Sequence, residues 1–265
     1  MSNTMELSKA ELIASAQAQM QAKFHIPERT VREKLALACR ILFAGGHDSG
    51  LAGQITARGE SAPGETPATY YTQQLGLGFD EITPSNILLV DEDLNIVEGE
   101  GMPNPANRFH SWIYRARSDV KCIVHTHPLH VAALSMIGVP LAVSHMDNCT
   151  LYDDCAFLAE WPGVPVGNEE GQIISEALGD KRAILLAHHG MLVAGSTIEE
   201  ACVLSLQFER TARMQLLAMA AGEIKPISPD LGREAHDWIL KPRRSQIGFE
   251  YYARRALREN PDLLA

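Results

Sequence analysis

Ile123-Val124-His125-Thr126-His127-Pro128-Leu129-His130 is an apolar run that leads into two histidines one residue apart. In an extended strand, successive side chains alternate between the two faces. His125 and His127 therefore project side by side, and Thr126 lies on the opposite face. Pro128 has no N–H to donate to a neighbouring strand, so the strand ends at about this point. The stretch predicts a strand that offers two imidazoles to one metal ion.

A second apolar run also ends in histidine, over Ala183-Ile184-Leu185-Leu186-Ala187-His188-His189-Gly190. A third ligand is expected, because a catalytic metal site commonly has three protein ligands and one open position. Neighbouring residues on a strand face opposite ways, so only one of His188 and His189 reaches the ion. The alternative is that these are ordinary strand-end histidines, but two such motifs together favour a metal site.

These two motifs, together with Arg108-Phe109-His110, resemble those of the class II aldolase/adducin family. The resemblance extends from about Val31 to Gly222. It implies an α/β fold of the layered α/β/α class, with a largely antiparallel central sheet. We expect a single domain over residues 1–265, with extensions at 1–25 and 224–265.

The resemblance also implies a ligand set and an assembly. A divalent ion is held by His125, His127 and His189, with zinc the first expectation and manganese, iron or nickel as alternatives. Homotetramers are typical of the family. The family's aldolases carry a glutamate, and its epimerases an aspartate, four residues before the histidine that corresponds to His110. Here that position is Ala106, which resembles the bacterial adducin-like branch.

Further site residues are predicted around these motifs. Ala106 and His110 are four residues apart and share one helix face, so His110 is a candidate partner of a metal ligand. Packing alone is an equal alternative for this histidine. The glycine-rich stretch 47–58 contains Gly53, which we expect to contact substrate together with Ala106 and Asn107. The alternative for that stretch is a simple turn.

The acid or base of the reaction is not identified by spacing. With Ala106 in place of an acid, His130, His145 and Tyr152 are candidates for a substitute. His145 and Tyr152 lie in a stretch expected to be irregular, which continues to Cys155.

Composition narrows the class of protein. The chain has 265 residues, of which 46% are hydrophobic, and a formal net charge of −10. No block of basic residues occurs, which argues against nucleic acid or an anionic membrane as the main partner. No stretch of about 18 apolar residues is present, so no membrane span is expected. The expected partners are a small-molecule substrate and further copies of the chain.

Cysteine usage and the first residues indicate a compartment. The five cysteines are scattered and contain no C-x-x-C pair, which is typical of a reducing cytoplasm. The N-terminus lacks the basic start and apolar core of a signal peptide. We expect a cytoplasmic protein.

The remaining pattern predicts mixed helices and strands. Thr30-Val31-Arg32-Glu33 fits a capping box at the start of a helix that ends at Gly45. Pro63 and Pro67 predict an exposed loop over 59–68. A loosely attached N-terminal helix and a surface helix at 249–258 are expected in the two extensions. Other predicted helices are 107–117, 131–137, 169–178 and 197–222. Predicted strands are 69–72, 87–90, 96–98, 141–143, 183–187 and 191–194, with a short one inside 162–167.

A three-histidine site acts as a Lewis acid or activates water. Cleaving a carbon–carbon bond beside a chelated carbonyl leaves an enediolate, which the metal stabilises. Decarboxylation uses the same electron sink and needs no base to remove a hydroxyl proton. The sequence therefore predicts a divalent-metal-dependent carbon–carbon lyase, of aldolase or decarboxylase type, for a small hydroxy-carbonyl or oxo acid.

Two other classes stay open. One is a different metal reaction on the same scaffold, such as epimerisation, dehydration or oxygenation. The other is a non-catalytic, adducin-like binding protein. Ala106 in place of an acidic residue favours this class, and the three histidines argue against it. Metal analysis of the purified protein separates an enzyme from a scaffold.

Overall fold

The structure is a computed structural model, and it describes residues 4–59 and 68–265. Residues 60–67, which form most of the predicted 59–68 loop, lie outside these ranges.

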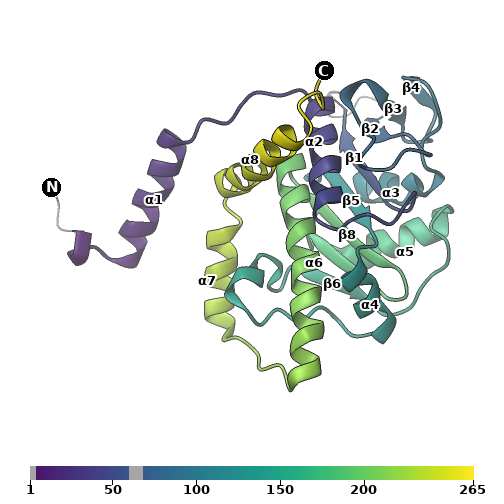
Figure 1. The fold of residues 1–265 in the computed structure, drawn as a ribbon. Helices are drawn as coiled ribbons and strands as arrows, with labels where there is room; N and C mark the ends of the chain where they lie inside the picture. The colour runs from purple at the N-terminus through teal and green to yellow at the C-terminus, as the bar shows by residue number, and fades with distance from the viewer. Residues whose placement is uncertain (1–3, 60–67) are drawn as a thin grey trace.

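A single sheet passes through the middle of the structure (Figure 1). It has eight strands in the order β4-β3-β2-β1-β5-β8-β7-β6. Every neighbouring pair is antiparallel except β6 and β7, which confirms the expected, largely antiparallel sheet. The strands are β1 (Gln54–Arg58), β2 (Thr69–Gln73), β3 (Ile87–Asp91), β4 (Ile96–Glu98), β5 (Cys122–Thr126), β6 (Cys155–Leu158), β7 (Ala183–Leu186) and β8 (Gly190–Gly195).

Helices cover both faces of the sheet and complete the layered α/β/α architecture (Figure 1). One hydrophobic cluster joins the sheet to α3 and α5, and the other joins it to α2, α4, α6 and α8. The α-helices are α1 (Lys9–Lys23), α2 (Val31–Ala44), α3 (Arg108–Ala116), α4 (Leu129–Ile137), α5 (Asn168–Leu178), α6 (Ile198–Ala221), α7 (Pro229–Ile239) and α8 (Pro242–Glu259). Short 3-10 helices are η1 (Thr4–Glu6), η2 (Pro84–Asn86), η3 (Pro105–Asn107) and η4 (Met146–Leu151).

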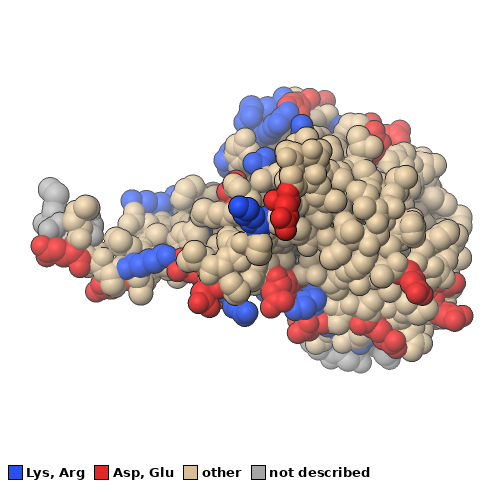
Figure 2. All heavy atoms as spheres, turned by 90° about the horizontal axis from the view of Figure 1, so that it is seen from below, with Lys and Arg blue, Asp and Glu red and all other residues tan. Residues whose placement is uncertain are grey.

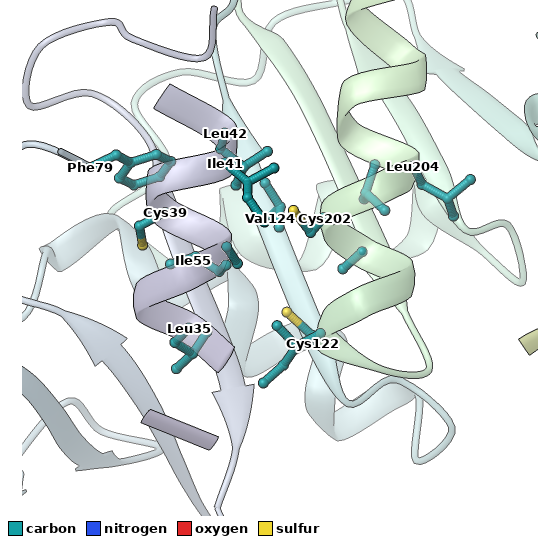
Figure 3. Close-up of a cluster of buried hydrophobic side chains, with 14 of the residues drawn as sticks. Leu35, Cys39, Ile41, Leu42, Ile55, Phe79, Cys122, Val124, Cys202 and Leu204 are labelled. Carbon is teal, nitrogen blue, oxygen red and sulfur yellow. The ribbon is translucent and has the colours of Figure 1, made fainter. Parts of the chain in front are cut away.

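Strand β5 lies near the centre of the sheet and is buried along its whole length. Cys122 and Val124 point into the cluster that contains α2 and α6, as Figure 3 shows. Ile123 belongs to the cluster on the α3 face. Burying an aliphatic side chain of this size contributes about 1.5–3 kcal/mol, so the register of β5 is strongly determined. Alternation then directs His125, like Ile123, to the α3 face.

Helix α2 begins where the sequence predicts. The Thr30 side chain accepts a hydrogen bond from the Glu33 N–H, and the Glu33 carboxylate accepts one from the Thr30 N–H. This reciprocal pair satisfies two backbone donors at the helix start. The helix ends at Gly45, whose N–H donates to the Ile41 carbonyl.

Three local predictions were wrong. Residues 141–143 form no strand, because the Ala142 N–H donates to the Gln215 side chain of α6 instead of to a strand. Cys155 was expected in an irregular stretch but begins β6, which pairs with β7 at the edge of the sheet. The short strand expected inside 162–167 is absent, and these residues form bends and turns.

The two terminal segments differ in how they pack. Helix α1 has no buried residue and projects from the rest of the structure (Figure 1). Helix α8, predicted as a surface helix, buries Phe249, Ala253 and Ala256 on one face. These residues lie at i, i+4 and i+7, so they share one helix face and complete the core beside α2 and α6.

The described surface gives no sign of a membrane span or of a basic stripe on the face in view. Within residues 4–59 and 68–265, no helix combines the length and the apolarity needed to cross a bilayer. On the face shown in Figure 2, one group of lysine and arginine side chains lies at the upper edge beside acidic side chains, and basic and acidic side chains alternate below it.

Candidate metal centre

The side chains of His125, His127 and His189 meet where β5 ends and the β7–β8 turn begins. Their candidate ligand atoms all lie within 4.8 Å of one another. The Nε2 atoms of His125 and His127 are 2.9 Å apart. In the part of the chain that the structure describes, this is the one group of three or more His, Cys, Asp or Glu side chains with such spacing. Nitrogens placed about 2.0–2.1 Å from a common zinc-type ion fit this arrangement.

The orientation of His125 follows from the pairing of β5 with β8. His125 lies opposite Leu192, and Thr126 lies opposite Met191. The Nδ1 atom of His125 is 2.8 Å from the Met191 carbonyl oxygen, to which it donates. This bond holds the tautomer with the proton on Nδ1, so the lone pair of Nε2 is left for an ion.

The β7–β8 turn decides between the two adjacent histidines. His188 has a φ of 57°, which reverses the chain direction, and its side chain is exposed. Its N–H donates to the Ser135 carbonyl at 3.1 Å. His189 is half-buried, and its ring centroid is 4.7 Å from those of both His125 and His127. The structure therefore brings His189, and not His188, into the cluster.

Gly190 allows the turn to approach the first histidine motif closely. A Cβ atom at this position would lie 2.5 Å from Cδ2 of His127 and 2.6 Å from the Thr126 carbonyl oxygen. Both distances are well below van der Waals contact. A glycine is therefore required here by space, because any side chain would displace His127.

Burial keeps the three imidazoles neutral at ordinary pH. It lowers the pKa of His189 to about 4, and the neighbouring His127 adds to this effect. Burial also lowers the pKa of His127, and it lowers that of His125 well below 6.5, with His189 as the next contributor. A metal ligand must carry a free lone pair, so deprotonated imidazoles suit the role.

His110 is placed near the cluster without bonding to it. Its Nδ1 atom is 2.8 Å from the Thr56 hydroxyl, and burial lowers its pKa to about 3. The Phe109 ring makes edge-on contacts with both His110 and His125, at centroid distances of 4.5 and 5.0 Å. The hydrogen-bond partner of His125 is thus the Met191 carbonyl, and the contact of His110 with the centre passes through Phe109.

Of the three expected substrate-contacting residues, Gly53 packs against the strand that carries His125, and Asn107 and Ala106 have other partners. Gly53 has a φ of 110°, and a Cβ there would lie 3.0 Å from the His125 carbonyl oxygen, so its backbone packs against the histidine strand. Asn107 is buried and donates to the Thr72 hydroxyl at 2.9 Å, while its Oδ1 has no partner among the described residues. Ala106 is half-buried, and its N–H donates to Asn104.

The candidates for a substitute acid or base have partners outside the histidine cluster. His130 is bound through Nδ1 to Glu209 of α6 at 2.5 Å. His145 is exposed and accepts a hydrogen bond from the Asp147 N–H. The Tyr152 ring packs against Gly232 of α7. Among the described residues, no hydrogen bond or ring contact joins any of the three to the histidine cluster.

Two neighbours of the centre were missed by sequence analysis. His47 is buried and its Nδ1 lies 2.7 Å from the hydroxyl of Thr126, the residue between the two strand histidines. Gln54 pairs with His125 across β1 and β5 and is buried, with its Oε1 lacking a partner among the described residues. Strand alternation predicts that Thr126 faces away from the histidines, but nothing in the sequence around Thr126 identifies His47 as its hydrogen-bond partner.

Comparison with known proteins places this geometry in a family. The family model of the Class II Aldolase and Adducin N-terminal domain matches residues 33–216. A 4-hydroxy-3-prenylphenylpyruvate oxygenase/4-hydroxy-3-prenylbenzoate synthase of Streptomyces roseochromogenus subsp. oscitans is 30% identical over 218 residues, which are 82% of this chain and 77% of that protein. Decarboxylase NovR of Streptomyces niveus is 30% identical over 216 residues, or 81% of this chain and 78% of that protein.

Solved structures agree with the sequence comparison. The L-fuculose 1-phosphate aldolase from Glaciozyma antarctica superposes with a TM-score of 0.78 and is 28% identical, covering 89% of this chain and 96% of that one. The family model's span, residues 33–216, contains all eight strands and the three histidines. The chain therefore belongs to the class II aldolase and adducin family.

Proposed function

We propose that the protein is a divalent-metal-dependent lyase that breaks a carbon–carbon bond beside the carbonyl group of a small oxo acid, with loss of CO₂ favoured over aldol cleavage. The observation that carries this proposal is a cluster of three histidines that contains no carboxylate, in a chain with Ala106 at the position where the family's aldolases carry an acid.

The donor set suits a divalent ion. His125, His127 and His189 are held as neutral imidazoles by burial, and the Met191 carbonyl orients the first of them. Neutral ligands leave the ion its full charge. Imidazole suits zinc, iron, nickel and copper alike, so the donor set does not select among them. When bound there, the ion supplies a Lewis acid for the negative charge that develops on the substrate's carbonyl oxygen.

Decarboxylation fits the residues beside the centre better than aldol cleavage does. In a 3-oxo acid, the bond to the carboxylate breaks, CO₂ leaves, and the electron pair moves into the adjacent carbonyl group. Solvent then supplies one proton to carbon. Aldol cleavage must also remove a hydroxyl proton, and the half-buried methyl group of Ala106 cannot accept one. The name of Decarboxylase NovR supports this preference.

A second candidate is oxygenation of an aromatic 2-oxo acid. The relative from Streptomyces roseochromogenus is named an oxygenase of 4-hydroxy-3-prenylphenylpyruvate, and it is 30% identical to this chain. This reaction differs from the first because it consumes O₂ and requires a redox-active ion. Oxygen uptake therefore separates the two.

The metal centre is tested with two matched variants. His189→Asn removes a proposed ligand, whereas His188→Asn changes the exposed neighbour, where asparagine tolerates the positive φ. Elemental analysis after reconstitution with zinc, manganese, iron(II) or nickel should find about one ion per chain in the wild type and in His188→Asn. His189→Asn should bind far less. Equal metal content in both variants would contradict the proposed ligand set.

The reaction is tested on a chemical panel. We expect metal-dependent release of CO₂ from 3-oxo acids without O₂ uptake. Controls are 4-hydroxyphenylpyruvate with an oxygen electrode and L-fuculose 1-phosphate with detection of the aldehyde product. O₂ uptake coupled to consumption of the 2-oxo acid would contradict the proposed lyase activity and support the oxygenase activity. A metal-free protein that turns over none of these would favour a binding protein of the adducin type.

A further inference from the structure

A cavity of about 340 Å³ lies between α2, α6 and α8. Its lining includes Arg40, Ile41, Leu206, Tyr252, Ala256 and Asn260, and it shares no residue with the histidine centre. Figure 1 shows the three helices side by side. Helix α8 lies beyond residues 33–216, so one wall of the cavity is formed by the segment that follows the family domain.

Arg40 carries a charge that the described protein does not neutralise. Its Nη1 atom donates to Oδ1 of Asn260 at 2.7 Å, which is a neutral acceptor. Its Nε atom is buried and has no hydrogen-bond partner among the residues that the structure describes. Among the described residues, no carboxylate lies within ion-pair distance of this guanidinium, whereas the nearby Arg255 is paired with Glu259 at 2.9 Å. Arg40 lines the cavity with a guanidinium whose charge no described carboxylate balances, which favours an anionic ligand there.

Part of the cavity wall is apolar, whereas Arg255, Glu259 and Asn260 add polar groups. Ile41 and Ala256 are 3% and 5% exposed, and Leu206 packs against the same core cluster. A cavity of this volume is at the small end of ligand sites, which are usually lined by hydrophobic side chains with a few placed polar groups. A ligand with an apolar body and one charged end matches this distribution.

The charge environment limits the anion to a single negative charge. The cavity lies at the C-terminal ends of α2 and α8, where helix dipoles carry partial negative charge. Glu259 at the rim adds a carboxylate. A phosphate dianion is therefore disfavoured relative to a carboxylate, which carries one negative charge and can accept a charge-assisted hydrogen bond from Arg40.

We propose that this cavity is a second ligand site, which binds a small monocarboxylic acid through Arg40, with the apolar body of the acid against Ile41, Leu206 and Ala256. The site does not depend on the reaction at the histidine centre.

The test is calorimetric titration of the metal-loaded, full-length protein with benzoate, phenylacetate and hexanoate. Benzamide serves as the neutral isostere and inorganic phosphate as the dianion. At least one of the three carboxylates should bind saturably. Benzamide and inorganic phosphate should bind at least tenfold more weakly than that carboxylate. Arg40→Gln should lower the affinity for the carboxylate tenfold or more, because it removes a charge-assisted contact. His189→Asn, which alters the metal centre, should leave this binding unchanged.

Two further variants keep the test decisive if Arg40→Gln does not fold. Ala44→Leu adds volume at the exposed rim of the cavity, with a residue that favours helix, and should also weaken binding tenfold or more. Arg255→Gln alters the paired cation at the rim and should change affinity by less than about threefold. The proposal is overturned if no carboxylate binds, if benzamide binds as well as benzoate, or if His189→Asn abolishes the binding.

Discussion

At the scale of single residues, Gly190 determines how closely the two histidine motifs approach. Because a Cβ atom would lie 2.5 Å from the His127 ring, we expect Gly190→Ala to push His127 away from its neighbours. Overpacking of this kind costs about 1–3 kcal/mol. Urea unfolding should report a loss of that size, and elemental analysis should report reduced metal content.

Gly222→Ala is the matched control, because nothing lies within 4 Å of a Cβ atom built there. Its φ of 163° is extended and suits alanine. Unchanged metal binding in Gly190→Ala would mean that the close approach to His127 is not needed for the centre.

His110 predicts a pH dependence of stability. Burial lowers its pKa from 6.5 to about 3. Between these two pH values, residue 110 is protonated in the unfolded chain and neutral in the folded chain. The stability from keeping His110 neutral is present above pH 6.5 and is lost as the pH falls toward 3. Each pH unit in this window removes roughly 1.4 kcal/mol per such group.

The measurement is the free energy of unfolding of the metal-free protein at pH 7.5 and pH 5. The wild type should lose more stability than His110→Gln, which has no titrating group at this position. An identical loss in both proteins would contradict a neutral, buried imidazole at residue 110.

Ala106 offers a test that rests on the proposed reaction. Ala106→Glu places a carboxylate at the half-buried start of α3, where the helix dipole favours negative charge. We expect fold and metal content to persist, CO₂ release to stay equal or fall, and weak aldol cleavage of hydroxy-carbonyl compounds to emerge. A faster native reaction would instead indicate that a proton transfer at this position limits it. Loss of metal or of folding would show that residue 106 has no room for the carboxylate.

At the scale of elements, Glu209 of α6 fixes the beginning of α4. Its carboxylate accepts hydrogen bonds from the N–H groups of His130 and Val131, at 3.1 and 3.0 Å, and it binds the His130 imidazole. The first turn of α4 directly follows the proposed ligand His127, so this contact links α6 to the candidate metal centre. An acid at a helix start satisfies free donors and complements the dipole.

We therefore expect Glu209→Ala to cost about 1–3 kcal/mol of unfolding free energy, since charge-assisted hydrogen bonds to a helix terminus are lost. Glu176→Ala is the control, because the exposed Glu176 carboxylate accepts a hydrogen bond from the Gln172 side chain one helical turn away and has no hydrogen bond to another element in the described residues. The control should change stability by no more than about 0.5 kcal/mol. Equal effects of the two substitutions in urea unfolding would refute the role of Glu209.

At the scale of the whole molecule, the homotetramer expected from the family stays a prediction. Helix α1 has no buried residue, and an isolated helix of 15 residues is marginal in water, which favours a partner for it in solution. Light scattering at micromolar concentration should give a molar mass near that of four chains. A monomer over the whole range would contradict the prediction.

Several features of this molecule could be predicted from the sequence, because they depend on local periodicity. The two-residue period of β5 places His125 and His127 on one face, and the Thr30–Glu33 pair marks the start of α2. The apolar runs of β5, β7 and β8 are buried as their composition requires. These signals, with the family's motifs, were sufficient for the α/β fold and its largely antiparallel sheet.

Other features were decided only by tertiary structure, because they depend on partners distant in the chain. Strand β6 exists because Cys155–Leu158 pairs with β7, and residues 141–143 form no strand because their backbone bonds to α6. Strand alternation left His188 and His189 equivalent, and the turn's positive φ at His188 separates them. Likewise, the His130 imidazole is bound to Glu209, and the sequence of α4 gives no sign of a partner that lies 79 residues later in the chain.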